Sequence, residues 1–159
     1  MLVGQRCALV PTRRQRVTSA RPAQRVAIVT CMDCRIDPLA ALGLMPGDAH
    51  VLRNAGGVVT DDVIRSLAIS QRKLGTTSVR LIHHTDCGLL TLTDDEFRAE
   101  LQRDTGMAPP FAIESFTDIE DDVRQSILRV RSSPFLLHRH DVLGFVYDVE
   151  EGELREVDA

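Results

Sequence analysis

Thr30-Cys31-Met32-Asp33-Cys34-Arg35 is the stretch that decides how the rest of this chain is organised. It directly follows Val26-Ala27-Ile28-Val29, an uninterrupted apolar run typical of a strand buried on both faces. A carboxylate and a guanidinium are costly to bury unpaired, but in an α/β sheet such groups can converge on a ligand at the carboxyl ends of the strands. The stretch therefore predicts a strand over residues 25–30 that delivers two thiols and an ion pair to a binding site.

Length and composition indicate one globular domain. The chain has 159 residues, of which 43% are hydrophobic and 26% charged, so it can bury a core without disulfide staples. The formal net charge of -4 implies no general affinity for nucleic acid or acidic membranes, and no apolar run is long enough to span a bilayer. Cysteines placed beside His and Asp suggest metal or redox chemistry in a reducing compartment, and we expect a cytoplasmic protein.

Residues 1–24 are expected to form an arm outside the main domain, which covers residues 25–159. The arm contains no acidic residue, lacks a clear apolar period, and carries Pro11, Pro22 and the arginines Arg6, Arg13, Arg14, Arg16 and Arg21. We predict that it is flexible or packs on a partner. A targeting segment is the alternative, because transit peptides are also rich in Arg and poor in acidic residues.

Strands and helices alternate along the domain. Predicted strands cover residues 25–30, 49–53, 78–83 and 142–148, with a short edge strand over 153–157, and predicted helices cover 38–42, 61–74, 94–103 and about 115–130. This alternation predicts an α/β fold, with a parallel sheet flanked by helices. The first and third strands can be neighbours in such a sheet, so that their carboxyl ends meet.

The third predicted strand also ends in reactive groups, in the stretch His83-His84-Thr85-Asp86-Cys87-Gly88. Adjacent strand ends would bring Cys31 toward His84 and Cys87. Two thiolates and an imidazole are ligands for which zinc is the expected metal. A metal-free pair of redox thiols is a weaker hypothesis, because it leaves His84 and Cys87 without a role.

Three groups compete for the fourth position on the metal. Cys34 would close the site and make it structural, Asp33 would close it reversibly, and water would leave it open and catalytic. Arg35 favours a catalytic site, because a purely structural site has no use for a guanidinium. An Asp held by Arg can instead accept a hydrogen bond from zinc-bound water.

Other residues nearby are expected to be structural. His83 is predicted to be a histidine of the core or one that supports the metal ligands, with proton transfer as the alternative. Asp86 is predicted to be a turn residue that bonds local backbone N–H groups rather than a base. Gly56-Gly57 is predicted to allow close packing beside the site, because its surroundings lack the Lys and Ser/Thr of a phosphate loop. The acidic run over residues 118–122 is predicted to be the solvated first turn of a helix.

Three motifs of this chain resemble those of the β-class carbonic anhydrases, in particular the short bacterial branch. They are Cys31-Met32-Asp33-Cys34-Arg35, Val51-Leu52-Arg53-Asn54-Ala55-Gly56-Gly57 and His84-Thr85-Asp86-Cys87-Gly88. The resemblance implies a zinc enzyme that interconverts CO2 and bicarbonate through zinc-bound hydroxide. It implies that Cys31, His84 and Cys87 bind Zn2+ and that Asp33 with Arg35 forms a catalytic dyad that frees or occupies the fourth position.

The same resemblance implies a central four-stranded, mainly parallel sheet with an antiparallel edge strand. It also implies a homodimer or larger homo-oligomer with the active site near a subunit boundary. The chain departs from the family at two places: position 34 is usually Ser or Ala, and residues 1–24 lack the pattern of the family's usual N-terminal helix. Hydrolysis of carbonyl sulfide or carbon disulfide, and a non-catalytic zinc-stabilised domain closed by Cys34, are the alternative functions.

Overall fold

The computed structural model describes residues 19–159. Most of the predicted arm, residues 1–18, lies outside this range, so the prediction of a separate arm stays a prediction. Among the described residues, no helix combines the length and the apolar character needed to cross a membrane.

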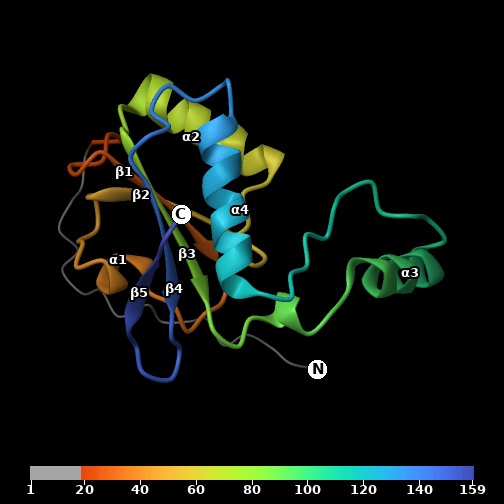
Figure 1. Cartoon of the computed structure of the whole chain (residues 1–159). Coiled ribbons are helices and arrows are strands. Elements are labelled where there is room, and N and C mark those ends of the chain that lie inside the picture. Colours follow the sequence, from red (N-terminus) through yellow and green to blue (C-terminus); the bar gives the residue numbers. More distant parts are fainter. Residues whose placement is uncertain (1–18) are drawn as a thin grey trace, which may run out of the picture.

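A single five-stranded sheet, with the order β2-β1-β3-β4-β5, forms the centre of the described chain (Figure 1). The parallel strands are β1 (Val26–Cys31), β2 (Ala49–Asn54), β3 (Ser78–His84) and β4 (Val142–Tyr147), and β5 (Leu154–Val157) runs antiparallel to β4. This confirms the predicted α/β fold, with four parallel strands and an antiparallel edge strand. β1 and β3 are neighbours in the register Thr30↔Ile82, so their carboxyl ends lie together.

The helices begin and end where local capping groups place them. They are α1 (Pro38–Ala41), α2 (Asp61–Leu74), α3 (Asp94–Thr105) and α4 (Ile119–Ser132), and a short 3-10 helix, η1, covers Gly88–Leu90. The Thr60 hydroxyl caps α2 by accepting from the Val63 N–H, and Gly75 ends it at a φ of 81°. Both features agree with the prediction from the sequence.

The predicted start of the last helix is wrong by several residues. α4 begins at Ile119 rather than near residue 115, because the Asp118 side chain caps it by accepting from the Asp121 N–H. Ser115 instead donates its backbone N–H and its hydroxyl to the Asp94 carboxylate at the start of α3. The segment before α4 is therefore held by α3 and does not continue the helix.

The main core lies between the sheet and the two helices α2 and α4 (Figure 1). Alternate residues of the central strands, such as Val29 and Leu81, pack with Leu67 of α2 and Ile127 of α4. α3, by contrast, stands away from the sheet and contributes no buried residue (Figure 1). The sheet with α2 and α4 thus forms the packed centre of the domain, and the reactive strand ends lie at its edge.

Candidate metal centre

Cys31, His84 and Cys87 form a buried cluster at the carboxyl ends of β1 and β3. Cys31 is the last residue of β1, His84 is the last residue of β3, and Cys87 follows it in the turn before η1. Their ligand atoms all lie within 4.8 Å of one another. The three residues predicted to bind a metal are therefore close enough to share one ion.

His84 presents an unbonded nitrogen within this cluster. Its Nδ1 lies 2.8 Å from the Thr85 carbonyl oxygen, which can only accept, so Nδ1 carries a proton and, in the neutral ring, Nε2 carries the lone pair. The Nε2 atom is buried and has no hydrogen-bond partner among the described residues. A buried polar atom without a partner is unfavourable, and a metal ion would satisfy it.

The two thiols have strongly different proton affinities. The hydrogen bond from Cys87 lowers the pKa of Cys31 to about 4. Burial opposes this shift, and a hydrogen bond from His84 adds to it. The same shared hydrogen bond, together with burial, raises the pKa of Cys87. Burial opposes the charging of His84, but the neighbouring Cys31 thiolate raises the pKa of His84 overall. The cluster thus supplies one anionic sulfur at neutral pH.

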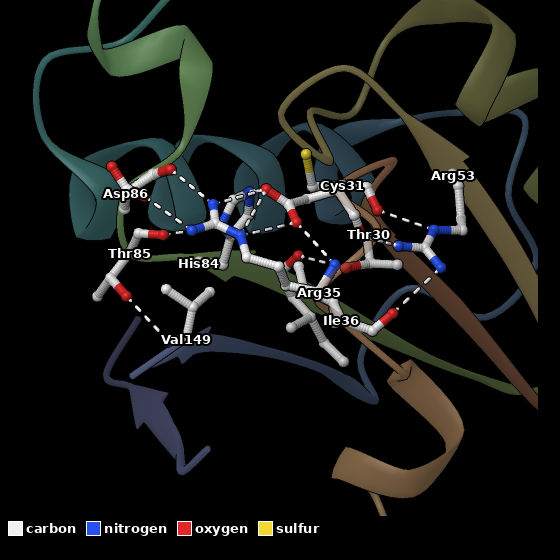
Figure 2. Close-up of polar contacts among 11 residues, drawn as sticks. Thr30, Cys31, Arg35, Ile36, Arg53, His84, Thr85, Asp86 and Val149 are labelled. Atoms are coloured by element: carbon white, nitrogen blue, oxygen red, sulfur yellow. Dashed lines mark hydrogen bonds and ion pairs between the residues drawn. The ribbon is translucent and has the colours of Figure 1, made fainter. Parts of the chain in front are cut away.

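Arg35 joins two carboxylates beside the cluster (Figure 2). Its Nε and Nη2 donate to the two Asp33 oxygens at 3.0 and 2.7 Å, and its Nη1 donates to Asp86 Oδ2 at 2.8 Å. The Arg35 hydrogen bonds hold the pKa of Asp33 well below its usual range. Asp33 Oδ2 lies 3.9 Å from His84 Nε2, so the ionised carboxylate lies next to the cluster.

The predicted role of Asp86 is wrong. We expected its carboxylate to bond backbone N–H groups of its own turn, but it accepts from the Arg35 side chain, 51 positions earlier in the chain. The Asp86 backbone has a φ of 54°, a left-handed conformation that Asp tolerates better than most residues. A pairing over this distance follows from the adjacency of β1 and β3 and has no local signal.

Arg53 is a functional neighbour to which the sequence argument assigned no role. From β2 it donates to the carbonyl oxygens of Cys31 at 2.9 Å, Ile36 at 3.2 Å and Asp33 at 2.5 Å (Figure 2). It therefore supports the backbone of the loop that carries Asp33. The register Thr30↔Arg53 between β1 and β2 is the feature that could have revealed it.

Cys34 and His83, next to the cluster in sequence, lie outside it. The Cys34 side chain is exposed and is not one of the grouped ligands. His83 is fully buried, as predicted for a core histidine, and its Nε2 lies 2.6 Å from Asp122 Oδ2. Asp122 was expected on a solvated face of α4, but it is buried because it pairs with His83.

Gly56 and Gly57 allow the loop after β2 to approach the cluster closely, as predicted. Both have positive φ angles, 74° and 76°. A β-carbon on Gly57 would lie 2.8 Å from the Cys31 backbone nitrogen, and one on Gly56 would lie 2.5 Å from Leu89 Cδ1. Side chains at these two positions would therefore displace the residues that form the site.

An apolar cavity of about 490 Å³ opens beside Cys31, Asp33 and Cys87. Its apolar lining includes Met32, Leu89, Leu92, Phe97, Phe111 and Ile113. The cavity therefore combines an anionic end, formed by the candidate metal ligands and Asp33, with walls suited to a small uncharged molecule.

Comparisons with known proteins agree on one family. Residues 26–108 match the family model described as carbonic anhydrase. β-Carbonic anhydrase 1 of Mycobacterium tuberculosis is 54% identical over 136 residues, which cover 86% of this chain and 83% of that protein. A carbon disulfide hydrolase of Acidianus is 32% identical, over 89% of this chain and 81% of that protein.

The solved structures agree. The crystal structure of the carbonic anhydrase of Streptococcus mutans has a TM-score of 0.85 and 48% sequence identity, covering 92% of this chain and 89% of that one. The family model over residues 26–108 includes both strand ends that form the cluster. The chain therefore belongs to the β-carbonic anhydrase family.

Proposed function

We propose that this protein catalyses the reversible hydration of carbon dioxide to bicarbonate and a proton, with Zn2+ held by Cys31, His84 and Cys87. The observation that carries the proposal is the buried cluster of these three residues with the Asp33 carboxylate beside it. Membership of the β-carbonic anhydrase family supports the same activity.

The donor set fits zinc. Two sulfurs and one imidazole nitrogen are three protein ligands, the number that catalytic zinc sites use while leaving a position open. The His84 Nε2 lone pair has no other partner among the described residues, and Cys31 is already a thiolate at neutral pH. Zinc bound there would act as a Lewis acid and lower the pKa of water, an effect for which carbonic anhydrases with three histidine ligands are the standard example.

The residues around the cluster have separable roles. Asp33 accepts a hydrogen bond from the attacking water and so orients its lone pair toward the substrate. Arg35 keeps Asp33 ionised and turned toward the guanidinium, because both carboxylate oxygens accept from it. Thr85 fixes the His84 ring through the Nδ1 hydrogen bond. Together these contacts pre-orient the groups that meet the substrate.

The walls of the cavity suit carbon dioxide, because that molecule is small, uncharged and without a hydrogen-bond donor. Apolar side chains such as Leu89, Phe97 and Ile113 would exclude water from the substrate side of the site. The bicarbonate product is charged and would leave toward solvent, since apolar walls offer it no partner.

Stopped-flow measurement of CO2 hydration with a pH indicator tests the proposal. Zinc-loaded protein should accelerate hydration between about pH 7 and pH 9, the range in which water on zinc ionises. Cys87→Ser serves as a matched control, because it alters one ligand sulfur to oxygen at nearly the same volume. Rates at background in zinc-loaded wild-type protein across this range would refute the activity.

Hydrolysis of carbon disulfide or carbonyl sulfide is the second candidate. Several relatives named carbon disulfide hydrolase are 31–34% identical to this chain, and the apolar cavity suits these molecules as well as it suits carbon dioxide. Sulfide release from carbonyl sulfide and from carbon disulfide, measured on the same zinc-loaded sample as CO2 hydration, separates the activities. The higher identity to a carbonic anhydrase makes CO2 hydration the first choice.

A non-catalytic zinc domain closed by Cys34 has less support. Cys34 is exposed and lies outside the group of candidate ligands, whereas Asp33 faces the cluster. X-ray absorption that counted three sulfurs around zinc would favour the non-catalytic zinc domain over the catalytic site.

We further propose a cytoplasmic homodimer or larger homo-oligomer. α3 contributes no buried residue, and the residues Met107 and Phe111, which follow it, are 72% and 57% exposed. A second copy packed on this segment would cover apolar surface next to the cavity. Light scattering coupled to gel filtration measures the mass of the assembly directly, and a monomeric mass would refute this part of the proposal.

A further inference from the structure

One guanidinium joins the two strand ends that form the candidate metal centre. Arg35, which follows β1, donates from Nε and Nη2 to Asp33, from Nη1 to Asp86 Oδ2, and from Nη2 to the Asp86 carbonyl oxygen at 3.0 Å. Asp86 lies between His84 and Cys87 in the turn that follows β3. The planar guanidinium of Arg35 therefore donates to Asp33 on one side and to Asp86 on the other (Figure 2).

This arrangement is better suited to fixing a position than to stabilising the fold. The side chains of Arg35 and Asp86 are 42% and 77% exposed, and ion pairs at such exposure contribute little to the free energy of folding. Asp86 makes the contact from a left-handed backbone, which is unfavourable for a residue with a β-carbon.

We propose that Asp86 is a positioning residue: it immobilises the guanidinium of Arg35 and thereby holds the Asp33 carboxylate in its orientation beside the metal ligands. The inference rests on the proposed function, because its effect on catalysis is exerted through Asp33. The resemblance placed Asp33 and Arg35 alone in the catalytic dyad, so Asp86 extends this dyad to a chain of three residues.

The contacts around Asp33 explain why the Asp33–Arg35 pair needs Asp86 as a third member. Asp33 Oδ2 lies 3.9 Å from His84 Nε2, a distance that a small rotation of the carboxylate would shorten. The Arg35 backbone N–H donates to Asp33 Oδ1 at 2.8 Å, and among residues 19–159 the Arg35 side chain is the one side-chain donor to the Asp33 carboxylate. That side chain is long and partly exposed. The Asp86 contacts remove its freedom, so that Asp33 stays turned toward Arg35 and available to the substrate side.

Two substitutions at one position separate this role from a structural one. Asp86→Gly removes the carboxylate and relieves the left-handed backbone, so the fold should not be weakened by strain. Asp86→Asn keeps an acceptor oxygen and tolerance of that backbone but removes the charge. Asp141→Asn is the matched control: it removes the charge from another Arg–Asp pair of 2.8 Å, which Asp141 forms with Arg80 near the opposite ends of the strands.

The full chain, loaded with zinc, is used for kinetics and for nitrogen-15 NMR of the Arg35 Nε–H group. We expect Asp86→Gly to lower kcat by about tenfold, as is usual when a residue that orients a metal site is lost, with KM within twofold of wild type. Asp86→Asn should fall between Asp86→Gly and wild type, and Asp141→Asn should match wild type. The heteronuclear NOE of Arg35 Nε should fall in the same order as kcat, while zinc content and the unfolding temperature stay unchanged.

The absorption spectrum of the Co2+-substituted protein supplies a readout that does not need turnover. We expect the visible bands to change in Asp86→Gly but not in Asp141→Asn, because the released Asp33 carboxylate alters the surroundings of the ion. Wild-type kcat in Asp86→Gly, or a loss of kcat that follows zinc content with an unchanged Arg35 NOE, would overturn the inference. If the wild-type protein turns over neither CO2 nor carbonyl sulfide, the proposed function fails, and the NOE and the Co2+ spectra still decide whether Asp86 positions the pair.

Discussion

The imidazole of His83 and the carboxylate of Asp122 lie 2.6 Å apart, joining the end of β3 to the first turn of α4. Both residues are buried. His83 directly precedes His84, so this contact anchors the strand end from which the candidate metal ligand projects.

Replacement of Asp122 by Ala should destabilise the protein. It leaves His83 Nε2 buried without a partner, and we expect the free energy of unfolding in urea to fall by about 2 kcal/mol. Asp121→Ala is the control, because it removes a carboxylate from the same helical turn whose side chain is 67% exposed. The free energy of unfolding of Asp121→Ala should fall by less than about 1 kcal/mol. Equal losses of unfolding free energy in the two variants would contradict the assigned role of the His83 contact.

Gly57→Ala should impair metal binding as well as stability. The new β-carbon would lie 2.8 Å from the Cys31 nitrogen, so the backbone that carries this ligand must shift. We expect zinc affinity, measured by competition with a chromophoric chelator, to fall by about tenfold or more. Gly75→Ala is the matched control, since its φ of 81° is equally unfavourable for Ala but its β-carbon meets no atom within 4 Å. Gly75→Ala should lose about 1 kcal/mol of stability and keep its zinc affinity.

Cys34→Ser should retain one zinc per chain and wild-type CO2 hydration, because Cys34 is exposed and outside the ligand cluster. Cys87→Ser should lose both. Metal analysis after dialysis gives the stoichiometry, and added zinc should raise the unfolding temperature of apo Cys34→Ser but not that of apo Cys87→Ser. Loss of zinc from Cys34→Ser would show that the exposed thiol is a ligand.

Asp94 should contribute stability that depends on pH. Hydrogen bonds from Ser115 lower the pKa of Asp94 in the folded state. A carboxyl group with a lowered folded pKa stabilises the protein above its unfolded pKa of about 3.9, and this contribution is lost as the pH falls through the folded pKa. The difference in unfolding free energy between wild type and Asp94→Asn should therefore be constant above about pH 5 and shrink below about pH 4.

The neighbouring Asp95→Asn substitution controls for the helix dipole, because both residues lie in the first turn of α3. Its effect should be smaller than that of Asp94→Asn at pH 7. If the difference in unfolding free energy between wild type and Asp94→Asn grew as the pH fell, it would contradict a lowered pKa of Asp94 in the folded state.

Local signals predicted the order and type of the elements. Thr60 and Gly75 mark the two ends of α2 because a side-chain oxygen and a left-handed glycine satisfy helix termini within a few residues. The uninterrupted apolar run of β1 likewise predicts a strand buried on both faces, and β1 is buried along most of its length. The start of α4 was missed, because Ser115 bonds to Asp94, which lies 21 positions earlier in the chain.

The sequence by itself determined the α/β order and which three residues meet in the candidate metal cluster, because strand period and parallel pairing bring the ends of β1 and β3 together. Only the tertiary structure decided that Cys34 faces solvent, that Asp122 is buried with His83, that Asp86 accepts from Arg35, and that Arg53 donates to the backbone of the loop around Asp33. The physical reason is that side-chain direction in a turn, and the partner of a charged group, depend on neighbours from distant parts of the chain, which spacing does not encode.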